Sequence, residues 1–164
     1  MTDFKALYAQ KLTTADQIAA EVKSGWLMGM DTGPSQAPAI MSAIAEKIKN
    51  SDITDVKVQT LLDIYPFEFY ADESLKGKMT GYSWFSSGGA RKAINGGYAD
   101  LLPCYYRDIP RHILTEYSYD AVCVEVKRSL RHVGKDRLRP HGGHAGRRRR
   151  KGIGRHDHLV ALPH

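Results

Sequence analysis

Two short loops in this sequence combine residue types that can bind an anion. They are 31–35 (DTGPS) and 86–89 (SSGG), and a stretch with helical periodicity follows each of them. Backbone N–H groups at the start of a helix attract negative charge. A phosphate, a carboxylate or the oxyanion of a thioester adduct would each be stabilised by such donors. The alternative is that these glycines only let the chain turn.

The segments around these loops alternate between strand-like and helix-like patterns. Neither kind of element can bury its apolar side alone, so the alternation predicts an α/β fold, a mostly parallel sheet with helices on both faces. Thr14 and Gln17 have the spacing of a capping box at the start of one helix. The expected strands cover 26–30, 55–62, 79–85, 99–103 and 119–126, and the expected helices begin near 15, 35, 90 and 108.

A parallel sheet brings the loops after successive strands to one edge, where ligands usually bind. We therefore expect 31–35, 86–89 and 103–106 to lie together at the carboxyl ends of the strands. One Gly-rich turn is a weak motif, so the preference for an anion can be read from these residues but the ligand cannot.

The order of three segments resembles the amino-terminal domain of the acetyl-CoA hydrolase/transferases. The segments are 11–30, 33–48 and 81–110, and the resemblance extends over about residues 10–126. The most specific part is 85–110, with an Arg-Lys-Ala helix start, a glycine turn, an Ala-Asp strand and a proline before a helix. The 4-hydroxybutyrate and butyryl-CoA:acetate CoA-transferases belong to this family.

The resemblance implies a Rossmann-like CoA-transferase half with coenzyme A as co-substrate and no metal. The partners it implies are an acyl-CoA and a short-chain carboxylate such as acetate. The substrate-binding positions that it carries over are Gly33, Pro34, Ser35, Ser86 and Ser87, although Gly33-Pro34 stands where the family more often has glycine-x-proline.

In this family a glutamate from the second half carries CoA as a glutamyl thioester, which is covalent catalysis. No segment of this sequence matches the glutamate motif. Glu116 and Glu125 are candidates only by residue type, because nothing places a base or an oxyanion donor beside them. We therefore assign no catalytic residue, and we expect this chain alone to be inactive.

The charge changes sign near residue 126. Residues 1–126 hold 12 Lys+Arg against 16 Asp+Glu, a net charge of −4, while residues 127–164 hold 12 against 2, a net charge of +10. Arg, Gly, His and Pro dominate the second segment, as they do when a GC-rich gene is read out of frame. The expected organisation is thus a family domain over 1–126 and a disordered basic tail over 127–164, produced by a frameshift and truncation.

Two functional alternatives remain for the tail. Residues 147–151 (RRRRK) could neutralise phosphates, which would make the protein a nucleic-acid-binding one, although the tail lacks interleaved aromatic residues for base stacking. A zinc site is the weaker alternative, because the histidines match no known ligand spacing. Its candidate ligands are His141, His144, His156 and His158.

The remaining features indicate a soluble, cytoplasmic protein. There is no run of about 18 apolar residues, and the first ten residues do not resemble a signal peptide. Cys104 and Cys123 form no CxxC pair, which argues against a disulfide framework or a cysteine zinc site. Whether the protein forms a homo-oligomer is left open by the sequence.

Overall fold

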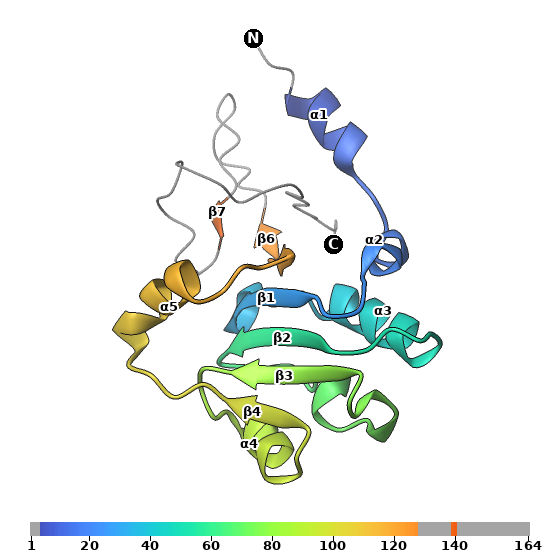
Figure 1. Cartoon of the computed structure of the whole chain (residues 1–164). Coiled ribbons are helices and arrows are strands. Elements are labelled where there is room, and N and C mark those ends of the chain that lie inside the picture. Colours follow the sequence, from blue (N-terminus) through green and yellow to red (C-terminus); the bar gives the residue numbers. More distant parts are fainter. Residues whose placement is uncertain (1–3, 128–138, 141–164) are drawn as a thin grey trace.

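A computed structural model describes residues 4–127 and 139–140 (Figure 1). Its centre is a parallel sheet of five strands in the order β4-β3-β2-β1-β5. The strands are β1 (Leu27–Thr32), β2 (Val56–Leu61), β3 (Met79–Ser83), β4 (Ala99–Leu101) and β5 (Ala121–Cys123). All four neighbouring pairs are parallel, which confirms the predicted α/β fold.

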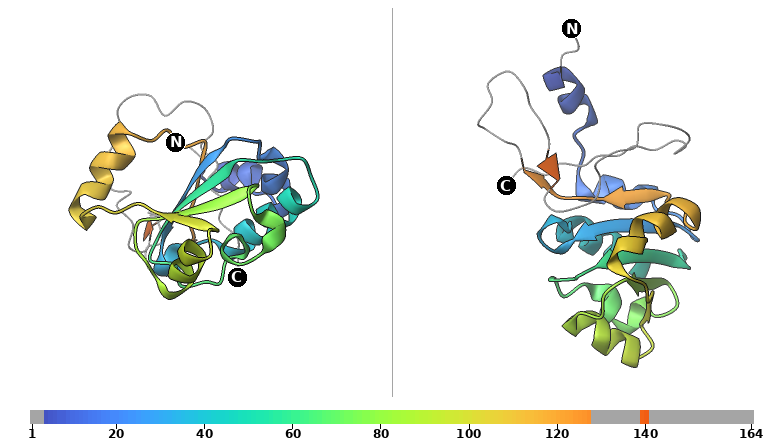
Figure 2. Two further views of the ribbon diagram at one scale, coloured as in Figure 1. Left: turned by 60° about the horizontal axis from the view of Figure 1, so that its bottom comes forward. Right: turned by 90° about the vertical axis from the view of Figure 1, so that its left-hand side faces the viewer.

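Five α-helices accompany the sheet. They are α1 (Phe4–Lys11), α2 (Ala15–Glu21), α3 (Pro38–Lys49), α4 (Gly88–Asn95) and α5 (Ile109–Thr115). The capping box at the start of α2 is confirmed, since the Thr14 side chain accepts from the Gln17 amide and the Gln17 side chain accepts from the Thr14 amide. The sequence analysis did not predict α1, which projects away from the sheet in Figure 1 and in the right-hand view of Figure 2.

One hydrophobic core lies between the sheet and α2, α3 and α4. Alternate strand residues point into it, as the burial of Val56 and Val58 on either side of the half-buried Lys57 shows. The apolar face of α3 covers these strands with five side chains that are 3% exposed or less: Ile40, Met41, Ile44, Ala45 and Ile48. Burial of this face, more than helix propensity, stabilises α3.

The opposite face of the sheet is covered at its carboxyl end by aromatic side chains that lead to α5. The Tyr119 ring lies so close to Gly29 in β1 that a Cβ there would come within 3.2 Å of it. Tyr119 also donates a hydrogen bond to Gln59 in β2. Trp84 contacts Tyr117 and His112, with ring centroids 5.8 Å apart in both pairs. α5 lies at the carboxyl end of the sheet, where its His112 contacts Trp84.

The chain reverses direction across the sheet once. From β1 to β4 it moves steadily outward, and β5 then returns to the free side of β1. Such a reversal is a topological switch point, and ligands in open α/β sheets bind outside the carboxyl ends of the strands beside it. The switch lies between β1 and β5, which places the loop after β1 at the expected binding edge.

The last described residues leave this sheet. Val126–Lys127 forms β6, which pairs antiparallel with β7 (Arg139–Pro140). The predicted strand 119–126 is thus shorter than expected, because the chain bends after Cys123 and the Glu125 amide donates to the Ser35 carbonyl. Arg139–Pro140 belongs to the segment predicted to be disordered. The rest of that prediction concerns 128–138 and 141–164, which lie outside the described residues.

Candidate functional site

The candidate site is the carboxyl edge of the sheet, where the loops after the strands meet (Figure 1). The arrowheads of β2 and β3 point to the side on which α5 lies. The hydrogen bond from the Glu125 amide to the Ser35 carbonyl, 2.8 Å long, joins the loop after β1 to the segment after β5 at the switch point. Because all neighbouring strands are parallel, the loops after β1, β3 and β4 leave the sheet at this same edge.

The loop after β1 is the short 3₁₀ helix η1 (Gly33–Ser35). Gly33 has φ +52°, a left-handed conformation that glycine adopts without steric cost. Gly33 and Ser35 are buried, with Ser35 only 1% exposed, whereas Pro34 is exposed. Of the three predicted positions in this loop, Pro34 is therefore the one exposed to solvent.

The loop after β3 ends in the N-terminus of α4. Ser87 is the N-cap, and its side chain accepts from the Ala90 amide at 3.4 Å. The Ser86 carbonyl accepts from Arg91 Nη2 at 3.1 Å. Gly88 and Gly89 are exposed, and a Cβ at either would meet nothing within 4 Å. The first turn of α4 thus leaves room for a ligand to approach the backbone, as an anion-binding helix start requires.

A buried polar network lies beneath these loops, and the sequence analysis did not predict it. Asp63, in the loop after β2, accepts from Gln36 Nε2 at 2.7 Å, from Thr60 Oγ1 at 2.8 Å and from the Tyr70 hydroxyl at 2.7 Å. Ser83 Oγ lies 3.5 Å from the same carboxylate. Gln36 and Ser83 are fully buried, so these contacts hold the ends of β1, β2 and β3 together.

Tyr70 and Asp63 form the centre of this network. Burial, and then the neighbouring Asp63 carboxylate, raise the pKa of Tyr70 well above its ordinary value. The phenol therefore stays protonated over the whole physiological range and acts as a hydrogen-bond donor. In this arrangement Tyr70 orients its neighbours as a donor.

The model of the acetyl-CoA hydrolase/transferase N-terminal domain matches residues 1–126. The chain belongs to the acetyl-CoA hydrolase/transferase family. This confirms the resemblance drawn from the sequence. Coenzyme A is the co-substrate of the CoA-transferases in this family.

Two characterised relatives of this acetyl-CoA hydrolase/transferase domain are CoA-transferases. The chain is 27% identical over 110 residues to the succinyl-CoA:cyclohexane-1-carboxylate CoA transferase of Geobacter metallireducens, which is 67% of this chain and 24% of that protein. It is 27% identical over 107 residues to the butyryl-CoA:acetate CoA-transferase of Anaerostipes caccae, which is 65% of this chain and 24% of that protein. The chain thus spans about a quarter of the length of either relative.

Solved structures agree with the fold of this family domain. The crystal structure of RipA from Yersinia pestis matches with a TM-score of 0.70 and 23% sequence identity, over 79% of this chain and 32% of that one. At this identity the likeness bears on the fold alone.

The two glutamates considered from the sequence lie in different settings in this family domain. Glu116 is 46% exposed at its side chain and pairs with His112, with Oε1 and Nδ1 2.6 Å apart. Glu125 is half-buried after β5, where its backbone bonds to Ser35. Neither finding assigns a role in catalysis to either residue.

The remaining candidates for chemistry in this domain are its two cysteines and groups of possible metal ligands. Cys104 and Cys123 are both free. Burial raises the pKa of both thiols, to about 12 for Cys123, so neither is activated as a nucleophile. Among residues 4–127 and 139–140, no three His, Cys, Asp or Glu side chains gather as metal ligands. The four histidines of the zinc hypothesis lie outside the described residues.

Within the described residues no helix has the length and apolar character needed to cross a membrane.

Proposed function

We propose that this chain is part of the amino half of an acyl-CoA:carboxylate CoA-transferase and that it binds the acyl-CoA at the carboxyl edge of its sheet. Family membership over residues 1–126 carries the proposal. The acceptor would be a short-chain carboxylate such as acetate, in line with the two CoA-transferases that the chain resembles. The backbone around Gly33, Pro34 and Ser35 and the α4 start after Ser86 and Ser87 would line the pocket.

In this reaction a glutamate carboxylate attacks the thioester carbonyl and expels the CoA thiolate, which leaves a mixed anhydride. The thiolate then attacks the glutamyl carbonyl and releases the first carboxylate, so that CoA is held as a glutamyl thioester. The acceptor carboxylate repeats these two steps in reverse and leaves as the new acyl-CoA. Splitting the transfer in this way replaces one difficult step with easier ones.

The glutamate in this proposal comes from a second half outside the 164 residues. The chain covers 24% of either CoA-transferase relative, and Glu116 is paired with His112, which supports this assignment. The amino half would contribute backbone donors that are already held in place when the ligand arrives and that stabilise its negative charge. Residues 1–164 alone would then bind CoA without turning it over.

Calorimetry with CoA tests the binding. The matched variants are Gly89→Asp and Gly89→Asn, which have nearly the same shape and differ in charge, at an exposed position where an added Cβ meets no neighbour. A carboxylate in the first turn of α4 should weaken CoA binding about tenfold through repulsion, and the amide should change it little. Absence of binding by the unaltered chain, or equal effects of both variants, would refute this binding edge.

Mass spectrometry tests the missing catalytic step. After incubation with acetyl-CoA, the chain should carry no thioester that hydroxylamine cleaves or borohydride reduces. A CoA adduct on any glutamate would show that the nucleophile lies within these residues.

The domain is proposed to end near residue 126, with an out-of-frame tail after it. The change of net charge from −4 to +10 at residue 127 supports this boundary. Translating the gene downstream of the codon for Val126 in the other two frames should reveal transferase-like sequence. Its absence in both frames would favour a genuine basic tail.

That genuine tail would suit nucleic-acid binding, the second candidate function, because residues 127–164 have a net charge of +10. Counterion release would then make the affinity fall steeply with salt and ignore base sequence. A filter-binding titration with one single-stranded DNA at several salt concentrations checks this. A signal that is undetectable or independent of salt removes this candidate.

A further inference from the structure

One carboxylate connects the ends of three neighbouring strands. Gln36 follows β1, Thr60 belongs to the end of β2, and Ser83 is the last residue of β3; all three side chains lie within 3.5 Å of the Asp63 carboxylate. The Gln36 side chain also accepts from the Ile64 amide at 3.2 Å. The loop after β2 is thus bonded to the loop after β1 by both the side chain of Asp63 and the backbone beside it.

The hydroxyl groups of Thr60 and Tyr70 both lie within hydrogen-bond distance of this carboxylate. The two hydroxyl oxygens are 2.8 and 2.7 Å from Oδ2 of Asp63 and 2.9 Å from each other, so that either hydroxyl can also donate to the other. A carboxylate is an acceptor only, and bonds to a charged acceptor are stronger than neutral ones. Asp63 therefore anchors a pair of hydroxyl groups and the Gln36 amide at once.

The backbone beside Asp63 is held in an unfavourable conformation. Leu62 has φ +54°, which is uncommon for a residue with a bulky side chain. Leu62 and Ile64 are 46% and 55% exposed, while the Asp63 side chain between them turns inward. Such backbone strain persists only where the surroundings determine it, and it concentrates at ligand-binding sites.

The network also reaches the loop that carries Ser86 and Ser87. Ser83 Oγ, 3.5 Å from Asp63, donates to the Phe85 carbonyl at 2.8 Å. Phe85 immediately precedes those two serines. Asp63 is in this way linked to both of the loops that were predicted to bind the ligand.

We propose that Asp63 is a positioning residue, which holds the loops after β1, β2 and β3 in the one arrangement that the CoA ligand meets. The identity of the ligand rests on the proposed function, whereas the ordering of the loops by Asp63 does not. Asp63 touches no ligand itself in this role. Its removal should loosen 33–36 and 84–87 while the helices of the core stay protected.

The test compares Asp63→Asn with Asp120→Asn in the full chain. Asp120 is a matched control at the opposite edge of the sheet, where its carboxylate accepts from the Leu27 amide at 2.8 Å. Asp63→Asn should raise amide hydrogen exchange of 33–36, 64 and 84–87 about tenfold and weaken CoA binding about tenfold, because buried donors lose a charged acceptor. Asp120→Asn should leave both the amide exchange of these loops and the CoA affinity within about twofold of the unaltered chain, even if the two variants lose the same thermal stability.

Unchanged exchange in the three loops of Asp63→Asn, or the same increase in Asp120→Asn, would overturn the proposal. If the unaltered chain binds no CoA, the proposed function fails but the exchange data still decide whether Asp63 orders the loops. Should Asp63→Asn fail to fold, Tyr70→Phe removes a single donor from the same carboxylate. A loop-confined increase of about threefold is then expected, and none would overturn the proposal.

Discussion

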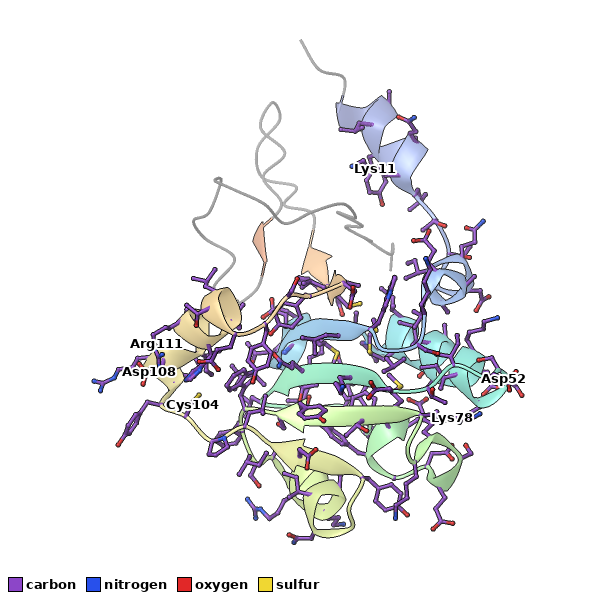
Figure 3. All side chains as sticks on the ribbon, viewed as in Figure 1. Lys11, Asp52, Lys78, Cys104, Asp108 and Arg111 are labelled. Atoms are coloured by element: carbon purple, nitrogen blue, oxygen red, sulfur yellow. The ribbon has the colours of Figure 1, made fainter. Side chains whose placement is uncertain are left out.

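The two edges of the same sheet are built differently. At the amino edge, Lys78 Nζ donates to the carbonyls of Ile48, Lys49 and Ser51 and so closes the C-terminal end of α3. At the carboxyl edge, the side chains of Gln36, Thr60 and Ser83, from the ends of three neighbouring strands or the loop after them, lie within hydrogen-bond distance of the Asp63 carboxylate. Figure 3 shows Lys78 and Asp52 at one end of the strands and Cys104, Asp108 and Arg111 at the other.

Backbone strain differs between the edges in the same way. β2 has a residue of positive φ before it, Asp55 at +57°, and another after it, Leu62 at +54°. Aspartate tolerates this conformation better than most residues, whereas leucine has no local hydrogen bond to offset the cost. The greater strain thus lies at the edge where a ligand is expected.

The exposed apolar residues of the strand-connecting loops also lie at the carboxyl edge. Large apolar side chains at least 46% exposed occur in the loops after β2, β3 and β4: Leu62, Ile64, Phe85, Tyr105 and Tyr106. The comparison teaches that the amino edge consists of local bonds that stabilise the fold, whereas the carboxyl edge combines strain and exposed apolar surface, which a bound molecule could use.

The largest effect is expected at Gly81, in the middle of β3. A Cβ there would lie 2.5 Å from the Tyr70 ring and 3.0 Å from the Phe69 ring, both buried. Gly81→Ala should therefore lower the free energy of unfolding by about 2–3 kcal/mol through overpacking. Urea unfolding measures it, with Gly88→Ala as the control, since a Cβ at Gly88 meets no neighbour.

Gly81→Ala also tests the link between the core and the carboxyl edge. Displacement of Tyr70 should disturb its bond to Asp63 and speed amide exchange in the loop after β2. A loss of stability spread evenly over both edges would argue that the Asp63 network is not a separate unit.

The second effect tests the amino edge alone. Lys78→Met removes a charged donor from three backbone carbonyls, so the free energy of unfolding should fall by about 1.5 kcal/mol. Lys76→Met is the matched control, because Lys76 is exposed and its ammonium contacts only the Tyr98 ring, at 4.7 Å, among the interactions described. Urea unfolding measures the difference. A change in CoA affinity for Lys78→Met would show that the two edges are coupled.

Much of this contrast was predictable in outline. The alternating patterns predicted five strands and a shared edge for the loops, because hydrophobic periodicity is a local property of the sequence. α1 was missed, as its exposed Leu7 and Tyr8 form no buried apolar face that a periodicity would reveal. β3 was expected to reach residue 85, but it ends at Ser83, whose hydroxyl bonds to the Phe85 carbonyl and turns the chain.

The site was less predictable than the fold. Gln36 and Asp63 are 27 positions apart and meet only because β1 and β2 are neighbours in the sheet. The left-handed conformation of Leu62 leaves no sign in its residue type. Conversely, Ser35 and Ser87 were carried over from the family resemblance, and the structure buries both of them, Ser87 as the cap of α4. Local chemistry identified the loops, but only topology could identify what holds them.

The third effect compares strain at the two ends of β2. Leu62→Gly should raise the free energy of unfolding by about 0.5–1 kcal/mol, because glycine adopts positive φ without a steric penalty. Asp55→Gly should give no gain, since aspartate is already tolerated there and the substitution also removes its ion pair with Lys57, 3.0 Å long. Urea midpoints at constant slope measure both. Equal gains at the two ends would remove strain as a difference between the edges.

The smallest effect concerns the acid stability of the amino edge. Lys49 Nζ lies 2.6 Å from Asp72 Oδ2, and this hydrogen bond, aided by the Ser74 side chain and amide, lowers the pKa of Asp72 from 3.8 to about 2. A carboxyl group with a depressed folded-state pKa contributes stability that is complete above its unfolded pKa and is lost as the pH falls through the folded one. The contribution of Asp72 should therefore disappear between about pH 4 and pH 2.

Thermal unfolding across this range should show a shallower acid decline for Asp72→Asn than for the unaltered chain or for Asp52→Asn, a control at an exposed aspartate near the end of α3. Because the pair is partly exposed, high salt should shrink the difference. If the difference in acid decline persists in high salt, Asp72 acts through more than its local pairing. The same conclusion would follow if Asp72→Asn changed only the amide hydrogen exchange of the carboxyl-edge loops.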